Sequence, residues 1–207
     1  MLYQIADNNL EPFIRQDLYE ISKSSLIQSP KVTTWIYFDG TEETSMQNVI
    51  FNKKGESMSY YSKGFYKESM YLTFSHEYQK IILDAKSSYE LNSDDPDTVS
   101  HFITHALGDC IMQSNNKNLE LILLFSSHGT GFAGYGGDDD TRRHLLQSNE
   151  SLSQAIQKAL FGIFNYNKKI DVLGFDACLM SSFVAIHEYA KAANNVLGSE
   201  STEPGHG

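Results

Sequence analysis

The chain has 207 residues, 41% of them hydrophobic, so it can bury a full core, and we expect a single domain over residues 1–207. Its formal net charge of −10 disfavours nucleic acid and anionic membranes as partners, and no apolar run is long enough to span a bilayer. The two cysteines, Cys110 and Cys178, exclude a disulfide scaffold. The first residues lack the features of a signal peptide. Localisation stays open, and a secreted or extracytoplasmic protein whose leader has been removed is among the alternatives.

The first half of the chain predicts two strands around a helix, followed by a polar stretch. Residues 2–6 are typical of a short strand, and apolar residues from Leu10 to Ile21 follow helical spacing. Residues 31–38 are β-branched and aromatic, so Trp35 is expected in a core strand. From 41 to about 73 the pattern is polar, with a hairpin tip predicted at Lys54-Gly55.

The second half alternates predicted helices and strands. Asp95-Pro96 indicates a helix start, and the apolar stripe that follows includes Cys110, which fits a buried structural cysteine. A strand leads into His128, and a Gly/Asp-rich loop runs to about residue 150. Ser151 opens the next predicted helix with capping-box spacing. A strand into Cys178, a helix over about 179–193 and a short strand at 196–198 complete the pattern.

Uninterrupted apolar strands alternating with helices predict an α/β fold, a mostly parallel sheet with helices on both faces. Ligands of such sheets bind at the carboxyl ends of the strands. His128 and Cys178 each follow a buried strand, so both are expected at that edge.

An imidazole and a thiol at one edge are the groups that a cysteine protease needs. At the start of a helix, Cys178 would be favoured as thiolate, and its amide with that of Gly129 could hold an oxyanion. The alternatives are a buried structural cysteine and a histidine that caps a strand end. The strand-to-helix turn at Cys178 and the glycines after His128 count against them.

Four segments carry a resemblance to the clostripain family of cysteine peptidases, relatives of caspases, legumain and gingipains. They are residues 5–11, 127–131, 176–180 and 198–205, each at a strand end. The separation between His128 and Cys178, 178 − 128 = 50 residues, is also close to the spacing of about 50 in caspases. The resemblance implies a caspase-like fold, a His128–Cys178 dyad and an acidic pocket floor at Asp176. The chain ends at Gly207, where chains of the family usually continue, so parts of the cleft contributed from beyond that point are expected to be absent.

The predicted activity is hydrolysis of a peptide or protein after Arg or Lys. Asp176 would bind the basic side chain, with Ser199 and Glu200 lining the same cleft; alternatively, Asp176 accepts local backbone N–H groups. Two rival functions stay open: the same fold with specificity for Asn or Asp, and an inactive caspase-like binding module.

Metal and loop motifs complete the candidates. His101 and His105 have metal-ligand spacing but no third ligand, so a solvated helix face is favoured. The chemistry requires no cofactor. Residues 138–140 are acidic and some family members use calcium, but a solvated loop is the preferred interpretation. Glycines and charges predict an exposed loop around Arg142 and Arg143, where a self-processing cut and a loop that is never cut are equally supported.

Overall fold

The computed structural model describes residues 1–25, 29, 31–40, 47–51, 57–61, 70–74, 92–114, 118–139 and 147–205. Its main feature is a six-stranded sheet in the order β5-β2-β1-β6-β7-β8. The five parallel strands are β1 (Leu2–Ala6), β2 (Thr34–Gly40), β6 (Ile122–Ser126), β7 (Ile170–Asp176) and β8 (Ala193–Leu197). The edge strand β5 (Met70–Phe74) pairs antiparallel with β2. A separate antiparallel pair comprises β3 (Gln47–Phe51) and β4 (Ser57–Tyr61).

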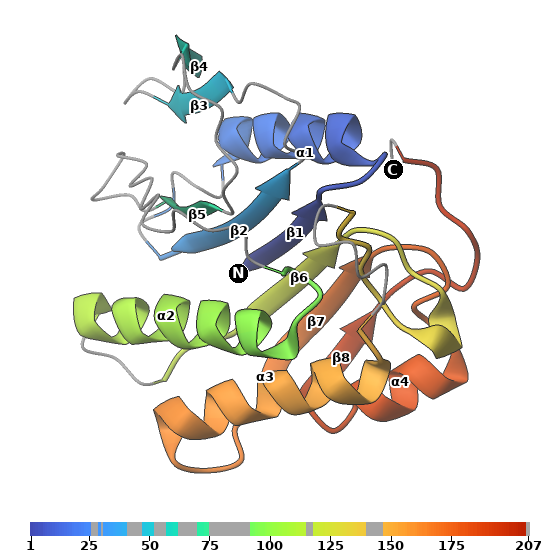
Figure 1. Ribbon diagram of the computed structural model, residues 1–207. Helices are drawn as coiled ribbons and strands as arrows, with labels where there is room; N and C mark the ends of the chain where they lie inside the picture. The colour runs from blue at the N-terminus through green and yellow to red at the C-terminus, as the bar shows by residue number, and fades with distance from the viewer. Residues whose placement is uncertain are drawn as a thin grey trace.

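Helices cover both faces of this sheet (Figure 1). Helix α1 (Glu11–Lys23) lies on one face, and α2 (Pro96–Ser114), α3 (Asn149–Phe164) and α4 (Phe183–Tyr189) lie on the other. A short 3-10 turn, η2 (Gly131–Ala133), follows β6. The predicted α/β architecture is therefore confirmed. None of the helices in the described ranges is long and apolar enough to cross a bilayer.

A row of aromatic rings crosses the sheet at one register level and anchors the core. Tyr37 of β2 pairs with Tyr3 of β1, Tyr3 with Phe125 of β6, and Phe125 with Phe175 of β7. The Tyr3 and Tyr37 rings stack with centroids 4.4 Å apart, and the Phe125 and Phe175 rings with centroids 5.5 Å apart. Phe102 of α2 packs against this row, which therefore faces the α2–α3–α4 layer. Alternation along each strand then directs the next residue toward the α1 side.

Most predicted elements are found, with shifted boundaries. Helix α2 begins at Pro96, and the Asp95 carboxylate accepts the Asp97 N–H at 2.8 Å, as its capping role predicts. Helix α3 begins earlier than predicted, because Ser148 rather than Ser151 is the N-cap and its hydroxyl accepts the Ser151 N–H. Strand β5 was not predicted, since its residues lie in a stretch that the polar pattern assigned to no core element. The hairpin tip at Lys54-Gly55 lies outside the described residues.

The prediction that Cys178 opens a helix is wrong. Residues 178–182 form turns, and α4 begins only at Phe183, with the Ser182 hydroxyl accepting the Ala185 N–H. Leu179 adopts a φ of 63°, which a right-handed helix cannot contain. The strand expected at 196–198 is β8, and it begins at Ala193.

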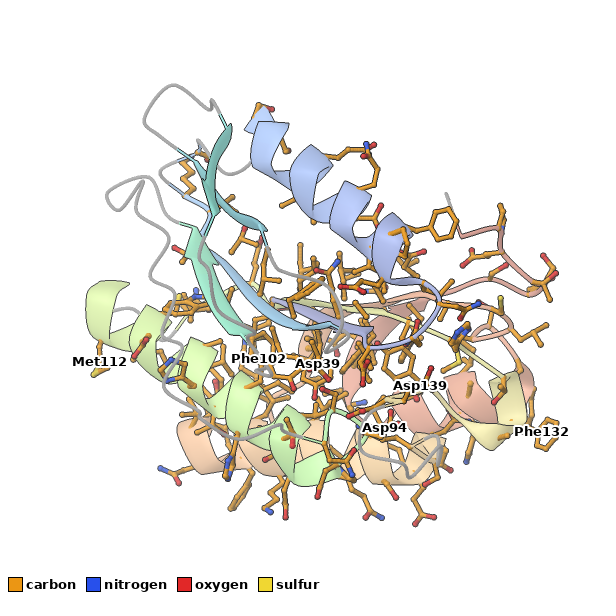
Figure 2. All side chains as sticks on the ribbon, turned by 45° about the horizontal axis from the view of Figure 1, so that its top comes forward. Asp39, Asp94, Phe102, Met112, Phe132 and Asp139 are labelled. Atoms are coloured by element: carbon orange, nitrogen blue, oxygen red, sulfur yellow. The ribbon has the colours of Figure 1, made fainter. Side chains whose placement is uncertain are left out.

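A buried polar network fixes the loop that follows β6. The Asp94 carboxylate accepts the N–H groups of Gly137 at 3.0 Å and Asp138 at 2.9 Å. The Asp138 carboxylate accepts the Ser93 N–H at 2.8 Å, and the Ser93 hydroxyl donates to Asp39. Figure 2 shows Asp39 and Asp94 inside the molecule, whereas Met112 and Phe132 project outward at opposite ends. Burial raises the pKa of Asp94, so ionising this carboxyl has a real desolvation cost.

Replacing Asp94 with alanine tests this network. Asp94→Ala leaves two amides of the loop without their acceptor, so we expect a loss of about 2–4 kcal/mol in the free energy of unfolding. Urea denaturation at neutral pH measures it. Asp97→Ala, which removes an exposed carboxylate bound to Lys158, is the control and should leave the free energy of unfolding nearly unchanged, because surface ion pairs contribute little to stability. Equal losses in the two variants would contradict the assignment.

Candidate functional site

The pairing of β6 with β7 places His128 and Cys178 at one edge of the sheet. Ser126 pairs with Asp176 at the carboxyl ends of these two parallel strands. His128 comes two residues after Ser126, and Cys178 comes two residues after Asp176. The backbone register thus places both residues beyond the same edge of the sheet, where the sequence pattern predicts them.

Gly129 brings the two loops into close backbone contact. A Cβ atom on Gly129 would lie 2.3 Å from the backbone carbonyl oxygen of Cys178, a distance that no side chain tolerates. Glycine is therefore required here by the approach of the two chains rather than by its own dihedral angles. Within the described part of the chain, the N–H groups of Gly129 and Cys178 donate no hydrogen bond. Both amides are available to an incoming acceptor.

An extended segment after β8 lies against Cys178. The Ser201 carbonyl accepts the Leu179 N–H at 3.0 Å, and the Ser199 carbonyl accepts the Ser181 N–H at 2.9 Å. The Cys178 Sγ accepts the Glu203 N–H at 3.2 Å and lies 3.7 Å from the Glu203 carbonyl oxygen. These bonds run antiparallel along the turn, so they explain why it does not wind into a helix. Ser199 thus supports the turn after Cys178 with its backbone carbonyl, while the Glu200 side chain is exposed.

His128 is half-buried and held from one side of its ring. Its Nε2 lies 2.8 Å from the Oδ1 of Asn9, in the loop between β1 and α1. Burial lowers the pKa of His128, and the negative charge of Asp139 opposes that effect. Asp139 is itself placed by its N–H, which donates to the Asp7 carbonyl at 2.9 Å. Asn9 lies within one of the four resembling segments, but nothing in the sequence pattern indicates its contact with His128.

Asp176 ends β7 on the side of the sheet that α1 covers, because it follows Phe175 of the aromatic row. Its carboxylate is exposed and accepts the Ser126 hydroxyl at 3.0 Å. The charge of Asp176 also acts on Asp17 of α1. Burial raises the pKa of Asp17 to about 6, and the charges of Asp176 and Glu20 add to the shift. The two carboxyl groups therefore repel each other on this side of the sheet.

Several other sequence candidates lie apart from this edge or differ from expectation. Cys110 and Cys178 are not joined in a disulfide, and His101 and His105 have exposed side chains on α2. Asp138 is fully buried, so its interpretation as part of a solvated loop is wrong. Its carboxylate accepts a hydrogen bond from the Ser93 N–H. Arg142 and Arg143 fall outside the described residues. In the ranges that the structure describes, no group of three or more His, Cys, Asp or Glu side chains is arranged to hold a metal ion.

Comparison with known proteins identifies the relatives of this chain. A sequence profile of the clostripain family matches residues 2–207. Clostripain from Hathewaya histolytica is 24% identical over 195 residues, which cover 91% of this chain and 35% of clostripain.

Two solved structures are similar over 100% of this chain and 49% of their own. One is a secreted C11 cysteine protease from Bacteroides thetaiotaomicron in complex with an irreversible peptide inhibitor, with a TM-score of 0.66 and 20% identity. The other is an inactive zymogen C11 protease from Parabacteroides distasonis, with a TM-score of 0.62 and 19% identity. The chain thus spans about half or less of the length of these relatives, and at these identities the structural likeness shows the fold.

The electrostatic setting of His128 can be tested without any substrate. Asp139→Asn removes the negative charge that raises the pKa of His128 and leaves the burial that lowers it. The pKa of His128 should therefore fall further below its usual value. Proton NMR titration of the ring, assigned with His128→Gln, measures the shift, and Asp97→Asn on the distant α2 is the control. An unchanged or raised pKa in Asp139→Asn would refute this account.

Proposed function

Because this chain belongs to the clostripain family, we propose that it is a cysteine endopeptidase that hydrolyses peptide bonds after Arg or Lys. One observation carries the proposal. Ser126 and Asp176 are paired at the ends of β6 and β7, and His128 and Cys178 each follow two residues later in the chain. This chemistry requires no cofactor, because the thiol supplies the nucleophile and the imidazole moves the protons.

In the proposed reaction, His128 takes the proton of the Cys178 thiol, and the thiolate attacks the carbonyl carbon of the scissile bond. The resulting oxyanion is held by the amides of Gly129 and Cys178, whose N–H groups have no acceptor among the described residues. His128 then gives its proton to the leaving amine, and water hydrolyses the acyl-enzyme in the second half of the cycle. The lowered pKa of His128 supports its role as a base, since it keeps the ring neutral to a lower pH.

The preference for a basic residue is proposed from the acidic side of the edge. Asp176 presents an exposed carboxylate two residues before Cys178. Asp17 of α1 adds a second carboxyl group, close enough for the charge of Asp176 to raise its pKa. A guanidinium or ammonium group of the substrate would offset the repulsion between the two carboxyl groups. A neutral Asn side chain cannot do so, and an anionic Asp side chain would add to the repulsion. Glu200 is exposed after β8 and is the next candidate for the acid of the pocket.

The first test separates an enzyme from an inactive binding module of the same fold. Cys178→Ala should abolish turnover of arginyl and lysyl fluorogenic peptides without unfolding the chain, and His128→Ala should lose nearly as much. Cys110→Ala, which removes the other cysteine of the chain, is the matched control and should retain activity. Parent protein incubated alone should also gain a new N-terminus after Arg142 or Arg143, and the Cys178→Ala protein should stay intact. Turnover that persists in a clean Cys178→Ala preparation would exclude Cys178 as nucleophile.

A second test addresses specificity. Asp176→Asn should lower kcat/KM for basic substrates by on the order of 30-fold or more, because the positive charge of the substrate loses its anionic partner. Iodoacetamide labelling of Cys178 should change little, since the thiol does not depend on that carboxylate. Asp171→Asn, at the opposite end of the same strand, is the control. If Asp176→Asn cleaves arginyl peptides as well as the parent, Glu200 becomes the candidate; faster cleavage of asparaginyl or aspartyl peptides by the parent would favour the rival specificity.

A further inference from the structure

The contact between Asn9 and His128 determines which nitrogen of the imidazole ring carries the hydrogen. An amide oxygen carries no hydrogen, so in the contact between Asn9 Oδ1 and His128 Nε2, at 2.8 Å, the ring nitrogen is the donor. A neutral histidine has one N–H group only, and its other nitrogen, Nδ1, then carries the lone pair. Among the described residues, Nδ1 has no hydrogen-bond partner. The arrangement therefore leaves Nδ1 as the basic nitrogen of the ring.

Asn9 itself is exposed, but the backbone around it is tied down on both sides. The Asn8 side-chain amide donates to the Gly137 carbonyl at 2.8 Å and the Ser127 hydroxyl at 3.3 Å. The Asn8 Oδ1 accepts the Leu10 N–H at 2.8 Å, which closes an Asx turn around Asn9. Ser127 directly precedes His128, and a Cβ on Gly137 would lie 3.5 Å from the His128 ring. The loop that carries Asn9 is thus tied to the two segments that flank the ring.

We propose that Asn9 is a positioning residue that fixes the Nε2–H tautomer of His128 and leaves Nδ1 to take the proton of the Cys178 thiol. The proposal rests on the proposed function for its catalytic consequence, although the tautomer itself does not depend on it. The proton moves from Sγ to Nδ1, which leaves a thiolate and an imidazolium. The Nε2–H bond to Asn9 persists and stabilises the imidazolium.

The tautomer can be read directly in the Cys178→Ala background, which removes the coupled thiol. We expect the nitrogen NMR shifts of the neutral His128 ring to show a protonated Nε2 and an unprotonated Nδ1. Asn9→Ala in the same background should give a mixture of tautomers, whereas Asn9→Asp, which keeps an acceptor oxygen, should retain the Nε2–H form. Asn9→Asp should also raise the pKa of His128 by about one unit or more, because a carboxylate favours the imidazolium. A protonated Nδ1 in the Asn9-containing protein, or an unchanged tautomer in Asn9→Ala, would overturn the proposal.

The kinetic consequence is tested in the protein that carries Cys178. Asn9→Ala should lower kcat by about 10–100-fold and keep KM within about twofold, because the His128 ring loses the partner that orients it. Asn9→Asp should recover most of that loss. Asn194→Ala is the matched control, because Asn194 is also exposed and makes one side-chain bond, to Asp171, at the distant end of the sheet. Equal losses in Asn9→Ala and Asn9→Asp would refute the role of the oxygen.

Two further comparisons keep the outcomes separate. If His128→Ala leaves both turnover and iodoacetamide labelling of Cys178 unchanged, the proposed dyad fails, while the tautomer experiment still decides the role of Asn9. If His128→Ala is inactive and Asn9→Ala behaves as the parent, only the positioning role fails. Thermal unfolding of each variant identifies a folding defect, and Asn9→Gln, which displaces the oxygen by one methylene, replaces Asn9→Ala should the latter not fold.

Discussion

The register of the central strands is the constraint from which the site follows. Four aromatic rings, on β2, β1, β6 and β7, lie at one level of the sheet and pack against the α2–α3–α4 layer. Burying one such ring contributes about 1.5–3 kcal/mol, and a slip of one residue would turn the whole row to the opposite face. With the row fixed, Ser126 and Asp176 must face the α1 side, and the loops that carry His128 and Cys178 must leave the sheet together.

Different supports hold the two reactive side chains beyond that edge. On the His128 side the support is a polar network, because Asn8 and Asp94 bind the backbone of the loop after β6. On the Cys178 side the support is the backbone of residues 199–203, which lies antiparallel along the turn. The two supports meet where Gly129 touches the Cys178 carbonyl. The site is therefore assembled by loop-to-loop contacts from several parts of the chain, and neither reactive residue is held by a helix.

This division explains what the sequence could predict. Strand ends are visible as apolar runs that stop at polar residues, so local pattern and the topology of parallel sheets suffice to place His128 and Cys178 past the same sheet edge. The turn after Cys178 could not be predicted in the same way, because its amides bind Ser199 and Ser201 and local propensity favoured a helix. Asp138 was misinterpreted for a similar reason: its partner, Ser93, is 45 residues away in sequence. Asn9 belonged to a recognised segment, but its contact with His128 is visible only in three dimensions.

The charges at this edge have a consequence for binding. Burial raises the pKa of Asp17 to about 6, and the charge of Asp176 adds to that shift. On the proposed assignment, a cationic side chain bound at Asp176 offsets that charge and lowers the pKa of Asp17. Binding below about pH 6 would then release a proton, so by linkage the affinity for a basic side chain should rise as the pH passes upward through that value. An uncharged side chain gains nothing from the same ionisation. The acidic pair therefore makes discrimination between basic and neutral residues stronger at neutral pH than in mild acid.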